Sequence, residues 1–299
     1  MPKSRRLKRP TFTISVIGSG RLGTALALAL SKTGYKVEAL VAQRLRSSRK
    51  VARLFLGKPL ALAENELTRV PASQLLLITT PDDVIEELAA RLARQLPSAS
   101  GQTVLHTSGA LSSSVLSPLA RRGRDIGSLH PLVSVSEPVV GAEALKNAFW
   151  CLEGDRKALT VARTLVRALD GHSFSIPAER KPLYHAAALM SSGHLTALVD
   201  LATEMLVACG LSYIKARQVL LPLVRSTVRN LKSYGPAQAL TGPFTRGDVA
   251  TIERHLKAIS GLAPYLLDTY KILGRHSLTL AERRGLQHSQ AARIQRKLR

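Results

Sequence analysis

Residues 12–33 read FTISVIGSGRLGTALALALSKT, and this stretch decides the fold of the first half of the chain. Its first part, residues 12–17, is a short apolar run rich in β-branched side chains, which predicts a buried strand. Its last part, residues 21–33, has the composition of a helix. The glycines between the two parts form the pattern G-x-G-x-x-G, in the strand–turn–helix context that a pyrophosphate-binding loop requires. The stretch therefore predicts the start of a dinucleotide-binding domain.

Each glycine of this motif is expected to have its own task. Gly18 allows a tight turn, Gly20 lets the backbone approach a pyrophosphate, and Gly23 lets the helix pack on the strand. The helix N-terminus then presents free N–H groups to the phosphates. The alternative is a glycine-rich turn without a ligand. The predicted cofactor-binding residues of the motif are Gly18, Ser19, Gly20, Arg21, Leu22 and Gly23.

The rest of the first half alternates apolar runs with helical stretches, which predicts a doubly wound, mostly parallel α/β sheet. Strands are expected at residues 36–42, 60–63, 74–80, 103–106, 125–129, 148–152 and 172–176, and helices at 47–56, 83–96 and 156–169.

The pattern changes after Pro177, because no strand is expected beyond it. Helical stretches fit residues 180–209, 212–233, 249–259 and 264–276, with turn signals between them. We therefore expect a nucleotide-binding domain over residues 11–178 and an all-α domain over 179–285. Basic tails are expected at residues 1–10 and 286–299.

Composition narrows the class of protein. The 299 residues are 45% hydrophobic, so a substantial core is expected, and only 4% are aromatic. The 43 Lys and Arg residues outnumber the 20 Asp and Glu residues, for a net charge of +23, which favours anionic partners. With few aromatic side chains and much of the charge at the two ends, no specific nucleic acid is expected as a partner.

The cellular location is predicted from the absence of a membrane-span pattern and of a signal-peptide pattern in the sequence. The longest charge-free stretch, residues 182–199, contains histidines and serines, so a buried helix fits it better than a membrane span. The basic start is not followed by an unbroken apolar run of signal-peptide length. Two cysteines, Cys151 and Cys209, suit a reducing compartment. We expect a cytoplasmic protein without a membrane partner.

The end of the second strand suggests which coenzyme is bound. A site for NAD usually has an acidic residue there to bond the ribose hydroxyls, but this chain has Ala42, Gln43 and Arg44. Glu38 lies too early, inside the strand. A basic, hydroxyl-rich stretch without an acid favours a 2′-phosphate, so NADP(H) is the expected cofactor and Arg44 its expected ligand. The alternative is a solvated basic helix face.

Polar residues also follow three later strands, where ligands of open α/β sheets bind. Further cofactor contacts are expected from Thr79, Thr80, Pro81, His106, Thr107 and Ser108, and His130 ends the next strand. For Ser108 and Asp82, a helix cap is the alternative role.

Four motifs together resemble a known family. They are HTSGA (residues 106–110), SLHPL (128–132), K-x-x-YHAAA (181–188) and ALTGPFTRGD (239–248). The chain resembles bacterial Rossmann-like proteins with a C-terminal helical domain of unknown function, in the superfamily of 6-phosphogluconate dehydrogenase, ketopantoate reductase and pyrroline-5-carboxylate reductase. The resemblance spans roughly residues 11–285. It implies a 6-phosphogluconate dehydrogenase C-terminal-like second domain, a nicotinamide-dependent oxidoreductase with its active site in the cleft between domains, and a homodimer. The chain departs from the family at Gly193, where the family usually carries Asn.

Reduction of a carbonyl or imine needs a proton or a positive charge beside the developing anion. Lys181 and His185 are spaced i, i+4 and share one face of a helix. The first candidate for the general acid is Lys181, with His185 orienting substrate or sharing the proton and His130 as the second candidate. The alternatives are a solvated helix N-terminus for Lys181 and a core histidine for His185.

The substrate-binding candidates lie further along the chain. Arg246 suits a bidentate clamp on a carboxylate, or it pairs with Asp248, which is expected to cap the next helix. The predicted substrate ligands are Ser192, Thr241, Gly242 and Arg246. No cluster with metal-ligand spacing is present in the sequence, so no metal site is predicted.

The sequence thus predicts an NADP(H)-dependent oxidoreductase that reduces the C=O or C=N of a small, carboxylate-bearing metabolite. A ketopantoate-like substrate is the first choice and a cyclic imine the second. The alternative is a non-catalytic dinucleotide-binding sensor or dimeric regulatory protein, which the departure at Gly193 favours.

Overall fold

The computed structural model describes residues 12–299, so the expected basic tail at residues 1–10 lies outside the described residues. The chain divides into two units, of which the first ends at Met190 and the second begins at Ser191. The expected boundary was at residues 178/179. It falls later because the first turns of helix α7 (Lys181–Ser191) are bonded to the sheet, as the site below shows.

The first unit is built on one eight-stranded sheet with the strand order β3-β2-β1-β4-β5-β6-β7-β8. Neighbouring strands are parallel except β6 and β7, so the sheet is mostly parallel, as predicted. The chain starts in the middle of the sheet and winds out to both edges, which is the doubly wound topology. The strands are β1 (Thr13–Ile17), β2 (Lys36–Ala42), β3 (Leu60–Ala63), β4 (Leu75–Ile78), β5 (Thr103–His106), β6 (Asp125–Pro131), β7 (Phe149–Gly154) and β8 (His172–Ser175).

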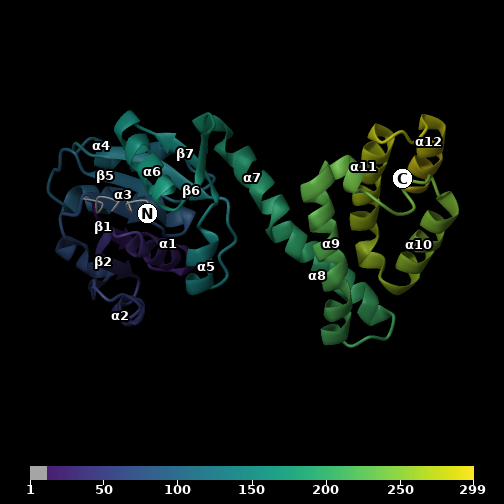
Figure 1. Ribbon diagram of the computed structural model, residues 1–299, viewed down its shortest axis with the longest axis horizontal. Coiled ribbons are helices and arrows are strands. Elements are labelled where there is room, and N and C mark those ends of the chain that lie inside the picture. Colours follow the sequence, from purple (N-terminus) through teal and green to yellow (C-terminus); the bar gives the residue numbers. More distant parts are fainter. Residues whose placement is uncertain (1–11) are drawn as a thin grey trace, which may run out of the picture. The chain divides into compact units, whose positions relative to one another are not determined.

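Each face of the sheet has its own apolar core. In β4, Leu75 and Leu77 join one core and Leu76 and Ile78 the other, because successive side chains of a strand point to opposite faces. The first face is covered by α1 (Arg21–Lys32), α5 (Pro138–Ala144) and α6 (Arg156–Ala168) (Figure 1). The second is covered by η1 (Glu64–Arg69), α3 (Asp82–Gln95), η2 (Ser113–Leu116) and α4 (Ser117–Ala120). Helix α2 (Leu45–Ala52) follows β2, and η3 (Ala178–Arg180) leads into α7.

The second unit is helical, as predicted, but the helix expected over residues 180–209 is interrupted at Ser192, which has φ −126° and ψ −73°. Helix α9 is kinked at Gly235, whose φ is +73°. Among the described helices, none combines the length and the apolar character needed to cross a bilayer. The helices are α8 (Gly193–Ala208), α9 (Tyr213–Ala239), α10 (Val249–Leu262), η4 (Pro264–Leu266), α11 (Leu267–Arg283) and α12 (His288–Lys297).

The segment expected to be a basic tail, residues 286–299, instead contains helix α12. Ala291, Ile294 and Leu298 are buried from this segment and pack against Ile252 of α10 and Leu278 of α11. Their spacing of three and four residues places them on one helical face. The basic residues between them concealed this amphipathic pattern.

Candidate functional site

The loop between β1 and α1 has the backbone that the glycine motif predicts. Gly18 has a φ of +103°, and a Cβ on it would come within 2.7 Å of the Thr79 carbonyl carbon. A Cβ on Gly23 would collide with Gly18 O and Thr79 Oγ1. A Cβ on Gly20 would meet only Gly18 O, at 4.0 Å. Gly18 and Gly23 are therefore required by the protein's own packing, whereas the space beside Gly20 is open to a ligand.

The start of α1 fits an anion such as a dinucleotide pyrophosphate. Its first turn contains no acidic residue, and no side chain caps it. Ser19 Oγ and Thr80 Oγ1 are buried beside this loop without a hydrogen-bond partner among residues 12–299. Buried hydroxyls are nearly always hydrogen-bonded, so two without a partner at a helix N-terminus suit a ligand that supplies acceptors. Arg21 and Leu22, also predicted as ligands, form the first turn of α1, where Arg21 is exposed.

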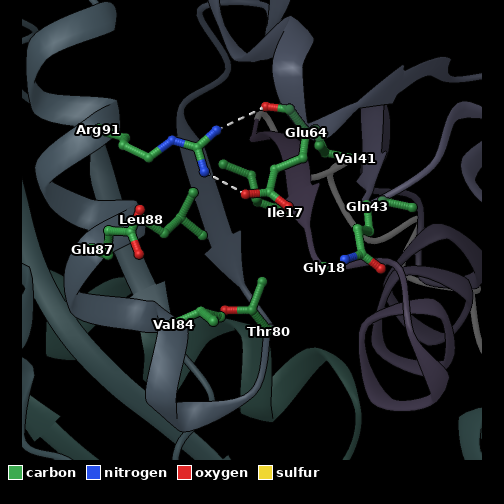
Figure 2. A pocket seen from close by; sticks show the side chains of 11 residues that line it. Ile17, Gly18, Val41, Gln43, Glu64, Thr80, Val84, Glu87, Leu88 and Arg91 are labelled. Atoms are coloured by element: carbon green, nitrogen blue, oxygen red, sulfur yellow. Dashed lines mark hydrogen bonds and ion pairs between the residues drawn. The ribbon is translucent and has the colours of Figure 1, made fainter.

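A pocket adjoins this loop at the carboxyl ends of the strands (Figure 2). Two of its residues, Glu64 and Arg91, were not anticipated. Arg91 of α3 donates from Nη1 to the Glu64 carboxylate and from Nη2 to the Glu64 carbonyl oxygen, at 3.2 Å. The only sequence signal was the place of Glu64, directly after a weak strand. The pocket is lined by Ile17, Gly18, Val41, Ala42, Gln43, Glu64, Thr80, Val84, Glu87, Leu88 and Arg91.

Arg44 lies where a 2′-phosphate ligand is expected. It is the N-cap residue of α2, directly after the end of β2, and it is exposed. It forms no ion pair with any residue in the described range 12–299. Ser48, from the same basic stretch, is buried and donates from Oγ to Leu45 O, so it is not available to a ligand. Four further exposed cations of α2 and its C-terminal cap line a surface hollow: Arg46, Arg49, Lys50 and Arg53.

Ser108 organises the loop after β5. Its hydroxyl donates to Asp82 Oδ2 over 2.7 Å and accepts from the N–H groups of Ala110 and Leu111, at 3.1 and 2.9 Å. The side chain of Ser108 therefore caps this loop in the structure and ties it to the start of α3. Thr79 Oγ1 donates to Gly18 O, at 2.7 Å. The other two predicted ligands of this edge are Pro81, the N-cap of α3, and Thr107, whose N–H donates to Ile78 O.

His106 is a buried, neutral histidine. Its Nδ1 accepts from Ser108 N at 3.1 Å, and its Nε2 lies 3.1 Å from the Ser112 carbonyl, to which it donates. Both ring nitrogens are therefore used, and a second ring proton would break the bond to Ser108 N. Burial, helped by the charge of Lys181, lowers the pKa of His106 from 6.5 to about 4.

Lys181 is completely buried, with 0% of its surface exposed. Its Nζ donates to Ser128 Oγ at 2.7 Å and to Ser108 O at 3.2 Å, so it links α7 to the ends of β5 and β6. Burial lowers its pKa, against the opposing effect of Cys151, Glu153 and Asp82. Lys181 is thus not a solvated helix N-terminus. This placement favours a positioning role over direct contact with a substrate.

His130, Tyr184 and His185 gather at the end of β6, and all three are partly exposed. His130 Nδ1 lies 2.7 Å from Tyr184 Oη, and the rings of His130 and His185 meet edge to face with centroids 5.6 Å apart. Burial, followed by the charges of His185 and Lys181, lowers the pKa of His130 from 6.5 to about 4. Burial raises the pKa of the Tyr184 phenol. At neutral pH the cluster therefore holds an uncharged imidazole bonded to an uncharged phenol.

Gly109 makes room for this cluster and was not singled out from the sequence. A Cβ on it would lie 2.6 Å from His185 Cδ2 and 2.8 Å from His130 Nε2. Those distances are too short for any side chain. The only signal was its place in the HTSGA motif.

The predicted substrate ligands belong to the second unit. Ser192 is the N-cap residue of α8, and Thr241, Gly242 and Arg246 lie in the loop between α9 and α10. Gly242 has a φ of +96° and accepts at its carbonyl from Thr245 Oγ1. Asp248 caps α10 by accepting from Thr251 N at 3.0 Å, as expected. Arg246 is exposed and forms no salt bridge within residues 12–299. It does act on Asp248, whose pKa is lowered first by its hydrogen bonds to Thr251 and then by the charges of Arg254 and Arg246.

Comparison with solved structures gives the same fold. A Bacteroides fragilis protein assigned as an NADP oxidoreductase superposes with a TM-score of 0.74 at 22% identity, over 90% of this chain and 98% of its own. A Thermotoga maritima protein gives 0.69 at 23%, over 91% and 99%. The reductive aminase of Aspergillus terreus, solved with NADPH and ethyl levulinate, gives 0.63 at 18%, over 95% and 99%. At these identities the likeness establishes the fold.

Family profiles divide the sequence in two. Residues 1–131 match the Rossmann-like domain, and residues 148–277 match a domain of unknown function, DUF2520. No curated protein matches the sequence. The profiles and the superpositions agree with the resemblance drawn from the four motifs, and the chain joins a Rossmann-like domain to a DUF2520 domain.

Proposed function

We propose that the protein is an NADP(H)-dependent oxidoreductase that reduces the C=O or C=N of a small, carboxylate-bearing metabolite. One observation carries the proposal. The same sheet edge holds a glycine loop with two unpartnered buried hydroxyls and a cluster of His130, Tyr184 and His185. A cofactor loop and polar groups with shifted pKa values at the strand ends are what such an enzyme needs.

The nicotinamide cofactor would supply a hydride when bound. The glycine loop, Ser19 and Thr80 would hold its pyrophosphate, and Arg44 its 2′-phosphate. In the tautomer whose Nδ1 carries no proton, His130 accepts the Tyr184 hydroxyl hydrogen, and His130 Nε2–H would polarise the substrate oxygen or nitrogen as a neutral donor. His185 delivers the proton that completes the reduction. Lys181 keeps the ends of β5 and β6 and the first turn of α7 in register.

The substrate class is proposed from charge and from the neighbours. The net charge of +23 and the exposed guanidinium of Arg246 suit a carboxylate. Two structural neighbours are pyrroline-5-carboxylate reductases, which favours trying cyclic imines first and ketopantoate-like 2-keto acids second. The predicted contacts of Ser192, Thr241 and Gly242 with substrate remain part of this proposal.

Binding of NADPH and NADH to the purified protein, measured by titration calorimetry, tests the cofactor site. We expect NADPH to bind more tightly. Arg44→Ala should weaken NADPH by about tenfold and NADH by less than about threefold, because one charged contact to a phosphate is lost. Arg53→Ala, at the far end of α2, is the matched control and should change neither affinity.

The outcomes separate two functions. If neither nucleotide binds, the oxidoreductase proposal fails. If NADPH binds but no keto or imino acid promotes its oxidation, the non-catalytic sensor is favoured. The departure from the family at Gly193 and the burial of Lys181 support that alternative. Equal losses for both nucleotides in Arg44→Ala would remove the 2′-phosphate assignment.

We further propose that the protein is a homodimer through its second unit. Helix α8 buries only Thr203, while apolar side chains of α8 and α9 are exposed, among them Leu223 at 63%. A monomer rarely exposes so many apolar groups on adjacent helices. Light scattering should give about twice the chain mass of 32.3 kDa, and Leu223→Glu should shift the protein toward monomer. A wild-type monomer at micromolar concentration would contradict the dimer.

A further inference from the structure

The pocket in Figure 2 contains the carboxylate of Glu64, at the sheet edge where β2 and β3 end. Ala42 at the end of β2 is the register partner of Ala63 at the end of β3. The next residues, Gln43 and Glu64, therefore leave neighbouring strands at the same sheet edge, and parallel strands lie about 4.8 Å apart. The acid that NAD sites carry after the second strand is present here one strand further along.

Arg91 forms an ion pair with that acid, Glu64. Its guanidinium binds both the Glu64 carboxylate and the Glu64 carbonyl oxygen, and Figure 2 shows it reaching across from α3 to do so. Arg91 is three-quarters buried and Glu64 is less so. A planar guanidinium fixed by two bonds holds a carboxylate in one position and neutralises it. The other carboxylate of the pocket, Glu87, is exposed and its charge is screened by solvent.

We propose that the Arg91–Glu64 ion pair determines coenzyme choice: Arg91 withholds the Glu64 carboxylate from the ribose hydroxyls and removes the negative charge that would repel a 2′-phosphate on Arg44. This inference rests on the proposed function, because it concerns the same cofactor site. Loss of Arg91 frees an acid that accepts hydrogen bonds from ribose hydroxyls and repels a phosphate, so the preference moves toward NADH.

The test is the ratio of NADPH to NADH affinities, measured by titration calorimetry on the full chain without any turnover assay. We expect Arg91→Gln to lower the ratio by about tenfold or more, since like charges disfavour binding at close range. In the double variant Arg91→Gln/Glu64→Gln the ratio should return to within about threefold of wild type. Arg94→Gln removes a cation from an exposed position of the same helix and should leave the ratio unchanged.

Two results would overturn the inference. One is an unchanged ratio in Arg91→Gln. The other is a double variant that keeps the full loss, because Arg91 would then bind the phosphate itself. If Arg91→Gln does not fold, Glu64→Gln is the test: it leaves the charge of Arg91 without a counter-ion, so the ratio of NADPH to NADH affinities should rise, and an unchanged or lower ratio would contradict the inference. If the wild type binds neither nucleotide, the proposed function fails; if it prefers NADPH and the Arg91 and Glu64 variants do not behave as described, this inference alone fails.

Discussion

Replacing His130 with Phe should lower kcat by about 10²- to 10⁴-fold on whichever keto or imino acid supports NADPH oxidation. The substitution removes the ring nitrogen that faces the substrate in the proposed mechanism and the bond to Tyr184. It retains an aromatic ring to pack edge to face against Tyr184 and His185. Steady-state kinetics with NADPH in excess measures the effect. The affinity for NADPH should stay within about threefold of wild type, because His130 is not expected to contact the phosphates.

The controls distinguish loss of the donor from general damage. His172→Phe alters an exposed histidine of the same sheet and should leave kcat unchanged. Tyr184→Phe keeps the imidazole but loses its partner, and we expect a smaller loss, of about tenfold, with a change in the pH profile. Near-wild-type turnover in His130→Phe would assign the donor to His185 or Lys181.

Acidification from pH 7 to pH 4 should strongly destabilise the first unit. The folded-state pKa values of His106 and His130 are about 4, whereas an unfolded histidine titrates near 6.5. Between these values the unfolded chain binds protons that the folded chain does not, so stability is fully present above pH 6.5 and is lost as pH falls through about 4. A shift of about 2.5 units corresponds to about 3 kcal/mol for each histidine. The two together predict a loss of about 6 kcal/mol.

Trp150 is the only tryptophan of the chain and is fully buried in β7, so its fluorescence reports unfolding of the first unit. Urea titrations at pH 7.5, 6, 5 and 4 give the free energy of unfolding at each pH. In His130→Phe, which removes one titrating group, the loss should be about half as large. A stability that is flat between pH 7.5 and 5 would show that the two imidazoles are not held neutral by the fold.

Most of the eight strands follow from sequence because they are short apolar runs between turn signals, as the buried strands of a parallel sheet require. The last strand, β8, has the sequence HSFS and is largely exposed, so burial does not explain it. The short helices α4 and α5 are not predicted from the sequence. They bury few residues and are too short to show a helical period of apolar positions. The break at Ser192 lies directly before Gly193, but a single glycine inside a helical pattern is tolerated and does not by itself predict a break. Helix α12 was hidden by the charges between its apolar positions.

For the candidate site, residues with a local motif were found and residues defined by packing were not. The glycine loop and the strand-end polar groups are read from short patterns. Glu64 and Arg91 are 27 positions apart and meet only because η1 and α3 cover the same face of the sheet. Lys181 is expected from sequence to be the general acid, with a solvated helix start as the alternative, but tertiary packing buries it against Ser108 and Ser128. Gly109 is needed because the rings of His130 and His185 lie against it, and no local sequence pattern predicts that contact.

The cationic face of α2 has a consequence for the helix itself. Arg46, Lys50, Arg49 and Arg53 are spaced three and four residues apart, and like charges at these spacings disfavour a helix. No acidic side chain lies in its first turn to offset them. Counter-charge should therefore stabilise α2, and we expect rising salt or a bound polyanion to slow the amide hydrogen exchange of this helix. A ligand phosphate at this edge would act on the fold as well as being held by it.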